Sequence, residues 1–102
     1  MKVAIKDPAA LGALKPLELV AYLRAKGWRK EVEFDNGSLW FWQSEQGVEY
    51  DVTLPAKREL GDYVLRIAEV LYTLSAAEGR SGLDVLRDIQ LLQIPAIKEG
   101  SN

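Results

Sequence analysis

Two carboxylates at alternate positions, Glu49 and Asp51, are the residues whose types and spacing come nearest to a catalytic arrangement. In an extended strand, side chains two residues apart point to the same face, so these acids would lie together. Glu31 and Glu33 have the same spacing in an earlier segment. Carboxylate oxygens are the ligands that Mg²⁺ and Ca²⁺ prefer, although acids in this pattern also keep an exposed sheet face soluble. A nuclease of the paired-acid type needs a lysine beside the second acid, and Thr53 stands in that place.

Other catalytic chemistries need residue types that the chain lacks. Its 102 residues include no histidine and no cysteine, which excludes Ser-His-Asp catalysis, Cys-His catalysis and thiolate metal sites. The phosphate-binding patterns G-x-x-x-x-G-K-[ST] and G-x-G-x-x-G do not occur. We therefore expect a non-catalytic protein with no cofactor and no metal. A metal-dependent hydrolase that uses the paired acids is the remaining enzymatic alternative.

The segment that carries these acids, residues 28–54, has the period-two alternation of a three-stranded antiparallel meander. The dipeptide Asn36-Gly37 favours a two-residue type I′ turn, because both central residues of that turn need positive φ. A four-residue loop at 44–47 would then lead into the third strand. This register predicts an outer face with Trp40 and Trp42 among the four acids. The inner, core-forming face would carry Val32, Phe34, Leu39, Phe41, Tyr50, Val52 and Leu54.

Helical periodicity on either side of the meander predicts a single α+β domain. Pro16 suits the first position of a helix that stops at Gly27. We expect that helix to bury Leu17, Val20 and Leu23, with Leu19 and Ala21 widening its apolar face. The sheet would have three strands, or four with an edge strand at residues 2–6. It would pack against this N-terminal helix and a C-terminal helical hairpin. The domain is expected to cover residues 1–92, with 93–102 as a tail or the start of a linker to a missing C-terminal region.

The C-terminal hairpin combines a long helix, ending near residue 78 with Gly79 as its stop, and a helix that begins at Ser81. Asp62 is placed to cap the long helix, whose apolar stripe exceeds half its circumference, so burial on two sides is expected. Ser81 and Asp84 have the spacing of an N-terminal cap. Arg80, between the two helices, can pair with Glu78 or Asp84.

Charge along the chain favours some partners over others. The net charge is −2, but residues 1–30 carry seven bases and two acids, and residues 31–51 carry six acids and no base. A small nucleic-acid-binding module is therefore an alternative, although acids around the tryptophans would repel phosphate. The basic patch for that alternative would consist of Lys26, Arg29, Lys30, Lys57 and Arg58.

The leading functional prediction is a protein-interaction or accessory module that binds another protein or a second copy of itself. Large exposed aromatic side chains usually mark an interface, and tryptophans ringed by acids suit an arginine or lysine of a partner. The alternative is that Trp40 and Trp42 are covered within the same chain as a second small core. The interaction candidates are Trp40, Trp42, Glu31, Glu33, Glu49 and Asp51.

Nothing in the sequence indicates a membrane or secretory destination. No apolar run approaches the roughly 18 residues that span a bilayer, and the first 14 residues lack the apolar core of a signal peptide. We therefore expect a cytoplasmic protein.

Several short strings in the chain resemble the N-terminal region of a family of uncharacterised bacterial proteins. The strings are YLRAKGW, LWFW and LGDYVLRIAEVLYTLSAAEGRSGLDVLRDI, and they cover roughly residues 14–92. The resemblance implies a larger parent protein of bacterial origin with no agreed activity, and it supplies no catalytic residues. The matching residues are Tyr22, Leu23, Gly27, Trp28, Leu60, Asp62, Tyr63, Glu78, Arg80, Ser81, Val85, Leu86 and Asp88.

Overall fold

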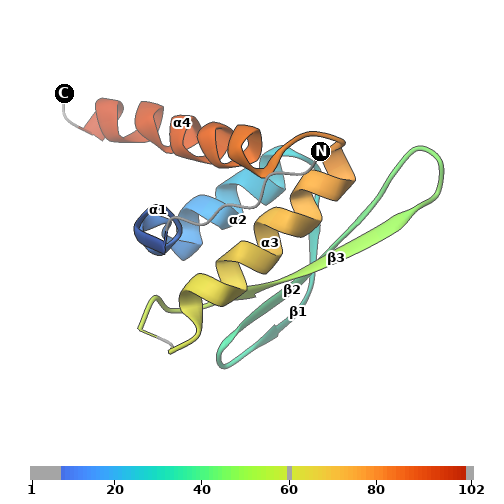
Figure 1. Ribbon diagram of the computed structural model, residues 1–102, viewed down its shortest axis with the longest axis horizontal. Helices are drawn as coiled ribbons and strands as arrows, with labels where there is room; N and C mark the ends of the chain where they lie inside the picture. The colour runs from blue at the N-terminus through green and yellow to red at the C-terminus, as the bar shows by residue number, and fades with distance from the viewer. Residues whose placement is uncertain (1–7, 60, 101–102) are drawn as a thin grey trace.

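One three-stranded sheet and four helices make up the part of the chain that the structure describes (Figure 1). The structure, a computed structural model, describes the backbone of residues 8–59 and 61–100 and the side chains of residues 9–59 and 61–92. The predicted edge strand at residues 2–6 lies outside these residues. The elements are α1 (Pro8–Ala13), α2 (Pro16–Ala25), β1 (Arg29–Phe34), β2 (Gly37–Gln43), β3 (Glu49–Pro55), α3 (Tyr63–Glu78) and α4 (Gly82–Gly100).

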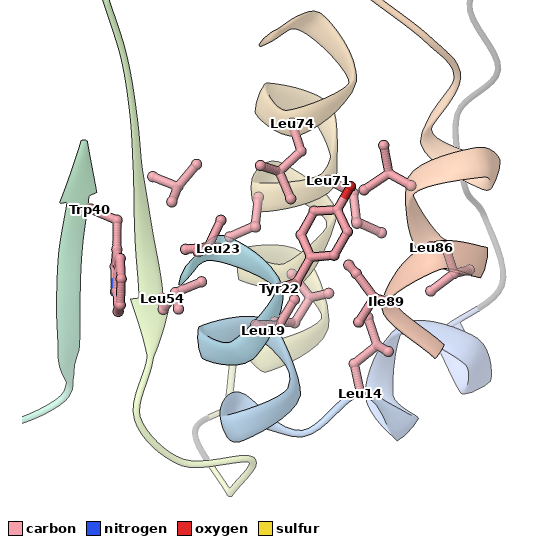
Figure 2. Packing of buried hydrophobic residues seen from close by; sticks show 14 of the residues in the cluster. Leu14, Leu19, Tyr22, Leu23, Trp40, Leu54, Leu71, Leu74, Leu86 and Ile89 are labelled. Carbon is pink, nitrogen blue, oxygen red and sulfur yellow. The ribbon is translucent and has the colours of Figure 1, made fainter. Parts of the chain in front are cut away.

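The strands form an antiparallel meander in the order β1-β2-β3, with the helices packed on one of its faces. Helices α2 and α3 lie against β3, and α4 packs on α2 and α3 from the far side. Figure 2 shows these three layers in turn, with Trp40 and Leu54 on the sheet, Leu23 and Leu74 in the middle and Ile89 on α4. This arrangement confirms the predicted α+β class and the two-sided burial of α3.

The helix boundaries follow local backbone chemistry. Gly27 and Gly79 have φ of 91° and 69°, which only glycine adopts without strain, and they end α2 and α3 as predicted. The hydroxyl of Ser81 accepts the backbone N–H of Asp84 at 3.2 Å, as expected for the start of α4. Asp62 occupies the N-cap position of α3 but makes no side-chain capping bond, because its carboxylate instead pairs with Arg66 Nε at 3.0 Å.

One expectation about the core-facing residues of the helices is wrong. Helix α2 turns Leu19, Tyr22 and Leu23 into the core, whereas the side chain of Leu17 is 79% exposed. Leu23 is buried and Val20 packs against the core, as predicted, so the prediction fails at Leu17 and in leaving out Tyr22. Helix α4 runs to Gly100, so the backbone of residues 93–100 is helical. The domain boundary at residue 92 stays a prediction.

The first turn of the meander differs from the prediction by one residue. Phe34 pairs with Gly37, so the two-residue turn is Asp35-Asn36 and not Asn36-Gly37. Glycine is needed at position 37 for a different reason: a Cβ there would lie 2.1 Å from the carbonyl oxygen of Leu54 on β3. Close approach of a neighbouring backbone, and not positive φ, therefore explains this glycine.

The second loop also shifts the register by one residue. It spans residues 44–48 rather than 44–47, because the Ser44 N–H donates to the Val48 carbonyl at 2.8 Å while the Val48 N–H donates to the Ser44 hydroxyl at 3.1 Å. As a result Trp40 pairs with Val52, not with Asp51. A shift of one residue exchanges the two faces of a strand. The face of β2 that was expected outside is therefore the inner one.

A bulge in β1 completes the exchange. The β1–β2 register changes between Lys30 and Val32, which leaves Glu31 as the extra residue. Before the bulge Trp28 belongs to the core; after it, Val32 and Phe34 fall on the outer face. Tyr50, Val52 and Leu54 face inward as predicted, whereas the prediction for Val32, Phe34, Leu39 and Phe41 is wrong.

Candidate functional site

The outer face of the sheet is the most unusual surface of the molecule. The described helices all pack on the opposite face, and this one carries a cluster of apolar side chains. Val32 and Phe34 are 50% and 45% exposed, and Leu39 and Phe41 are half-buried beside them. Cross-strand partners share a face, so the pairing of Val32 with Leu39 makes the cluster contiguous. We call the set Val32, Phe34, Leu39 and Phe41 the outer apolar patch.

Charged side chains stand on both flanks of the outer apolar patch. Phe41 on the central strand pairs with Arg29 on β1 and with Asp51 on β3. One row of residues across the sheet therefore consists of a cation, an aromatic ring and an anion. Glu49 lies on the same face one step further along β3, opposite Gln43. All four polar side chains are exposed. The patch is thus bounded by a positive charge on one edge strand and negative charges on the other.

The two tryptophans that the sequence placed outside lie on the helix side of the sheet. Trp40 is 1% exposed; its indole N–H donates to the Ser38 hydroxyl at 2.8 Å, and the guanidinium of Arg24 lies 5.4 Å from the ring centre. Trp42 is partly buried and stacks on Trp28 with ring centroids 6.0 Å apart. Trp40 is therefore covered within the chain, and Trp42 is covered in part.

The four acids expected around the tryptophans do not form a cluster. Glu31 sits at the bulge of β1, and Glu33 pairs with Lys30 Nζ at 3.1 Å. Glu49 and Asp51 lie two strands away on the outer face. Within the residues that the structure describes, no group of three or more acids could hold a metal ion.

The predicted basic patch is likewise divided between two ends of the sheet. Lys26, Arg29 and Lys30 surround the start of β1, where Lys26 Nζ lies 5.5 Å from the Tyr22 ring centre. Lys57 and Arg58 follow β3, which runs parallel to β1, so they lie beyond the opposite end. Arg58 is also engaged, because its Nε donates to the Gly12 carbonyl at 3.1 Å.

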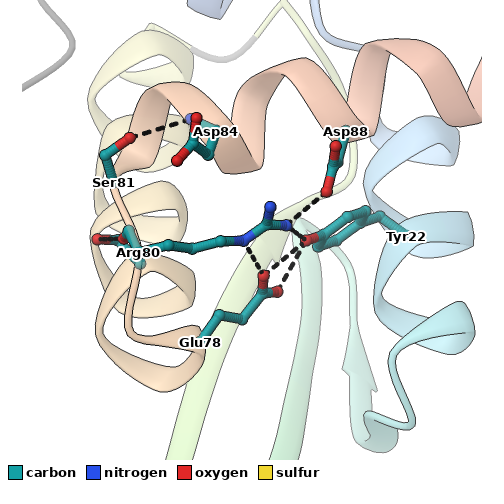
Figure 3. A network of polar contacts seen from close by, with 7 residues as sticks. Tyr22, Glu78, Arg80, Ser81, Asp84 and Asp88 are labelled. Carbon is teal, nitrogen blue, oxygen red and sulfur yellow. Dashed lines mark hydrogen bonds and ion pairs between the residues drawn. The ribbon is translucent and has the colours of Figure 1, made fainter.

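A polar network on the helix side is a feature that the sequence revealed only in part. Arg80, in the turn between α3 and α4, donates from Nε to Glu78 at 2.8 Å and from Nη2 to Asp88 at 2.6 Å (Figure 3). The same Nη2 lies 3.0 Å from the Tyr22 hydroxyl, which itself donates to Glu78 at 2.8 Å. The pairing of Arg80 with Glu78 was anticipated. Asp88 and Tyr22 were missed, although a buried tyrosine usually needs a polar partner for its hydroxyl.

The pKa shifts in this network favour the protonated forms of Tyr22 and Arg80, as expected for a network that holds helices together. Burial, and then the hydrogen bond and charge of Glu78, raise the pKa of Tyr22 above its ordinary value. The hydrogen bond to Asp88 is the main reason that the pKa of Arg80 is raised. Both groups therefore keep their protons at neutral pH, and neither is prepared to transfer one. The network joins α2, the end of α3 and α4.

A shallow pocket of about 280 Å³ opens beside the network. Trp28 and Trp42 form its apolar wall, and Lys26, Glu78 and Arg80 contribute charges. Glu78 and Arg80 already satisfy each other, as described above. The pocket therefore offers little unpaired polarity to hold a ligand, in contrast to the outer apolar patch, whose side chains have no cover from the described helices.

Comparison with known proteins adds no further identification. No family model, curated protein or solved structure matches this chain. The resemblance to uncharacterised bacterial proteins stays a prediction. Among the described helices, none has both the length and the hydrophobicity needed to cross a bilayer.

Proposed function

We propose that this chain is a non-catalytic interaction module that binds a protein through the outer apolar patch. The observation that carries the proposal is the one-sided sheet: the helices cover its inner face, while Val32 and Phe34 remain about half exposed on the other. An antiparallel sheet ordinarily presents polar residues on its open face. A contiguous apolar cluster there, rimmed by charges, is typical of a surface that a partner covers.

The face, and not the free edge of β1, is the binding surface that the residues favour. Four of the six β1 residues are charged, and the strand contains a bulge. Charged side chains and bulges are devices that prevent an edge strand from pairing with another chain. The apolar patch has no comparable protection, because its charges stand beside it and not within it.

The other functional classes have weaker support. The five basic residues lie at two ends of the sheet, so they offer no continuous track for a nucleic-acid backbone. The paired acids Glu49 and Asp51 have no third described acid with which to hold a metal ion. The proposal that the module is non-catalytic rests on the absence of a metal-binding group of acids among the described residues and on the mutual pairing of the polar side chains around Arg80.

Photo-crosslinking in the cells that produce the chain tests the proposal. A benzophenone amino acid would replace Phe34 in the outer apolar patch, and in a matched control it would replace Leu17, which is exposed on α2. We expect protein adducts from position 34 that disappear when Val32→Lys is added, and none from position 17. Adducts from both positions, or from neither, would refute an interface on this face.

A further inference from the structure

We infer that the partner is a second copy of this chain, packed outer face to outer face about a two-fold axis parallel to β2. This inference rests on the proposed function and names its partner. Two sheets packed face to face keep their strands nearly aligned and lie about 10 Å apart. Rotation about such an axis keeps each residue at the same height along the strand direction. It places β1 of one copy opposite β3 of the other copy.

The exchange of edge strands brings opposite charges together. Arg29 and Asp51 share one row of the sheet, on opposite sides of Phe41. After rotation about β2, Arg29 of each copy stands over Asp51 of the other, so the pairing is reciprocal and occurs twice. Self-complementarity of this kind is what a two-fold interface requires.

Among the described side chains, neither charge has an ion-pair partner. Arg29 and Asp51 are separated by two strand spacings, about 10 Å, and the Phe41 side chain lies between them. Among the described residues both side chains are exposed and neither takes part in an ion pair. The second copy would supply each with the missing counter-charge. The row also lies near the middle of β2, where sheet twist displaces facing residues least.

The apolar residues match under the same operation. Phe41 and Leu39, on the central strand, meet their own copies at the axis. Val32 on β1 is carried over Thr53 on β3, since both pair with Leu39. Phe34 is likewise carried to the level of Pro55, since both pair with Gly37, and Pro55 is already buried in its own chain. No apolar residue of the outer apolar patch is placed against a charge.

The size of the face sets the expected affinity. Three strands of about seven residues offer a face of roughly 15 Å by 24 Å, and an interface of this size belongs to the weak, transient class. We therefore expect a reversible dimer that is populated at about 0.1–1 mM protein and largely dissociated at low micromolar concentrations.

Sedimentation velocity with charge-reversed variants tests the geometry. Arg29→Asp alone places two acids over each other in both rows, and Asp51→Arg alone places two bases there, so each variant should be monomeric at 1 mM or dimerise at least tenfold more weakly. In an equimolar mixture of the two variants every row again holds opposite charges, and dimers should return. Recovery of dimers also shows that both variants are folded.

Two outcomes would overturn the inference. A mixture that stays monomeric, or single variants that dimerise as well as the natural chain, would exclude the proposed two-fold arrangement. Photo-crosslinking from position 34 separates this failure from that of the proposed function. Adducts of twice the chain mass of 11.4 kDa support a second copy. Adducts of other masses alone exclude self-association but keep an interaction surface, and the absence of adducts excludes both.

The absence of cysteine allows a direct check of the axis. Leu39→Cys places a single thiol beside the two-fold axis, about 10 Å from its copy across the two sheets. A bismaleimide with a spacer of that length should link two such chains rapidly, and the matched variant Leu65→Cys, exposed on α3, should link slowly. Equal rates for the two variants would contradict the proposed packing.

Discussion

Both faces of strand β2 carry large apolar side chains, and only one of these faces is part of the core. The inner face carries Trp40, Val52 and Leu54, each less than 5% exposed, and the outer face carries Val32 and Phe34, each about half exposed. Hydrophobicity therefore does not decide which side of β2 lies inside. The length of the loop at 44–48 and the bulge at Glu31 decide it, because each changes the register by one residue.

The sharpest test of this difference replaces an aromatic residue on each face. Trp40→Ala should lower the free energy of unfolding by about 3–5 kcal/mol, because it empties a fully buried site. Phe41→Ala, at the next position of the same strand, should cost about 1 kcal/mol because its side chain is only half-buried in one copy. Urea denaturation at low micromolar concentration measures both values. Equal losses would mean that the faces are assigned incorrectly.

The close approach of β2 and β3 offers the next largest effect. Gly37→Ala should destabilise the fold by about 2–3 kcal/mol, because the new Cβ would meet the carbonyl oxygen of Leu54 and the backbones would have to separate. Gly61→Ala is the matched control, since no atom lies within 4 Å of a Cβ there. Thermal unfolding of the two variants should differ clearly. If they unfold alike, position 37 needs no glycine and the register of the hairpin is wrong.

Alkaline pH should lower the free energy of unfolding because Tyr63 loses its hydroxyl proton. Its hydroxyl donates to the Leu14 carbonyl, and burial raises its pKa from 10.0 to about 12. The unfolded chain thus loses this proton first, so the stabilisation is complete below pH 10 and is lost as pH rises towards 12. Tyr63→Phe should cost about 1 kcal/mol at pH 7, yet its stability should fall less between pH 10 and 12. Parallel profiles from urea denaturation at each pH would show that Tyr63 makes no such contribution.

The smallest effect is expected on the outer face. Phe34→Ser should change the unfolding free energy by no more than about 0.5 kcal/mol at micromolar concentration, because its side chain is already 45% exposed. The same variant should lose the concentration-dependent association. A loss of stability above 1 kcal/mol would show that this side chain is part of a core and would weaken the case for a binding surface.

Much of the architecture could be predicted because it depends on local signals. Pro16 and Gly27 bound α2, the Ser81 hydroxyl caps α4, and an unusually wide apolar stripe indicated that α3 is covered on two sides. These features depend on residues close in sequence, whose preferences act within one or two turns of chain. The fold class follows from their order.

The candidate site could not be predicted because it depends on counting residues across loops. Period-two alternation in β2 fits either face, since Leu39 and Phe41 are apolar as well as Trp40 and Trp42. No residue type in the sequence indicates that Val48 belongs to the loop or that Glu31 forms a bulge. The prediction therefore placed Trp40 and Trp42 on the outer face, where the structure has Leu39 and Phe41. That this face is an interaction surface stays a proposal. Of the residues named for it, Asp51 and Glu49 are the ones that lie on this face.

The bulge at Glu31 has a consequence for how this sequence can change over evolutionary time. Substitutions in β1 alter one position each, but an insertion or deletion between Trp28 and Asn36 would exchange inward and outward side chains along part of the strand. Deletion of Glu31 itself is the exception, because it would remove the bulge and leave a regular ladder in which Lys30 still pairs with Trp40 and Val32 with Leu39, so Val32 and Phe34 would stay on the outer face. We therefore expect functional homologues to accept any residue, or none, at position 31 while keeping the other spacings between Trp28 and the turn constant.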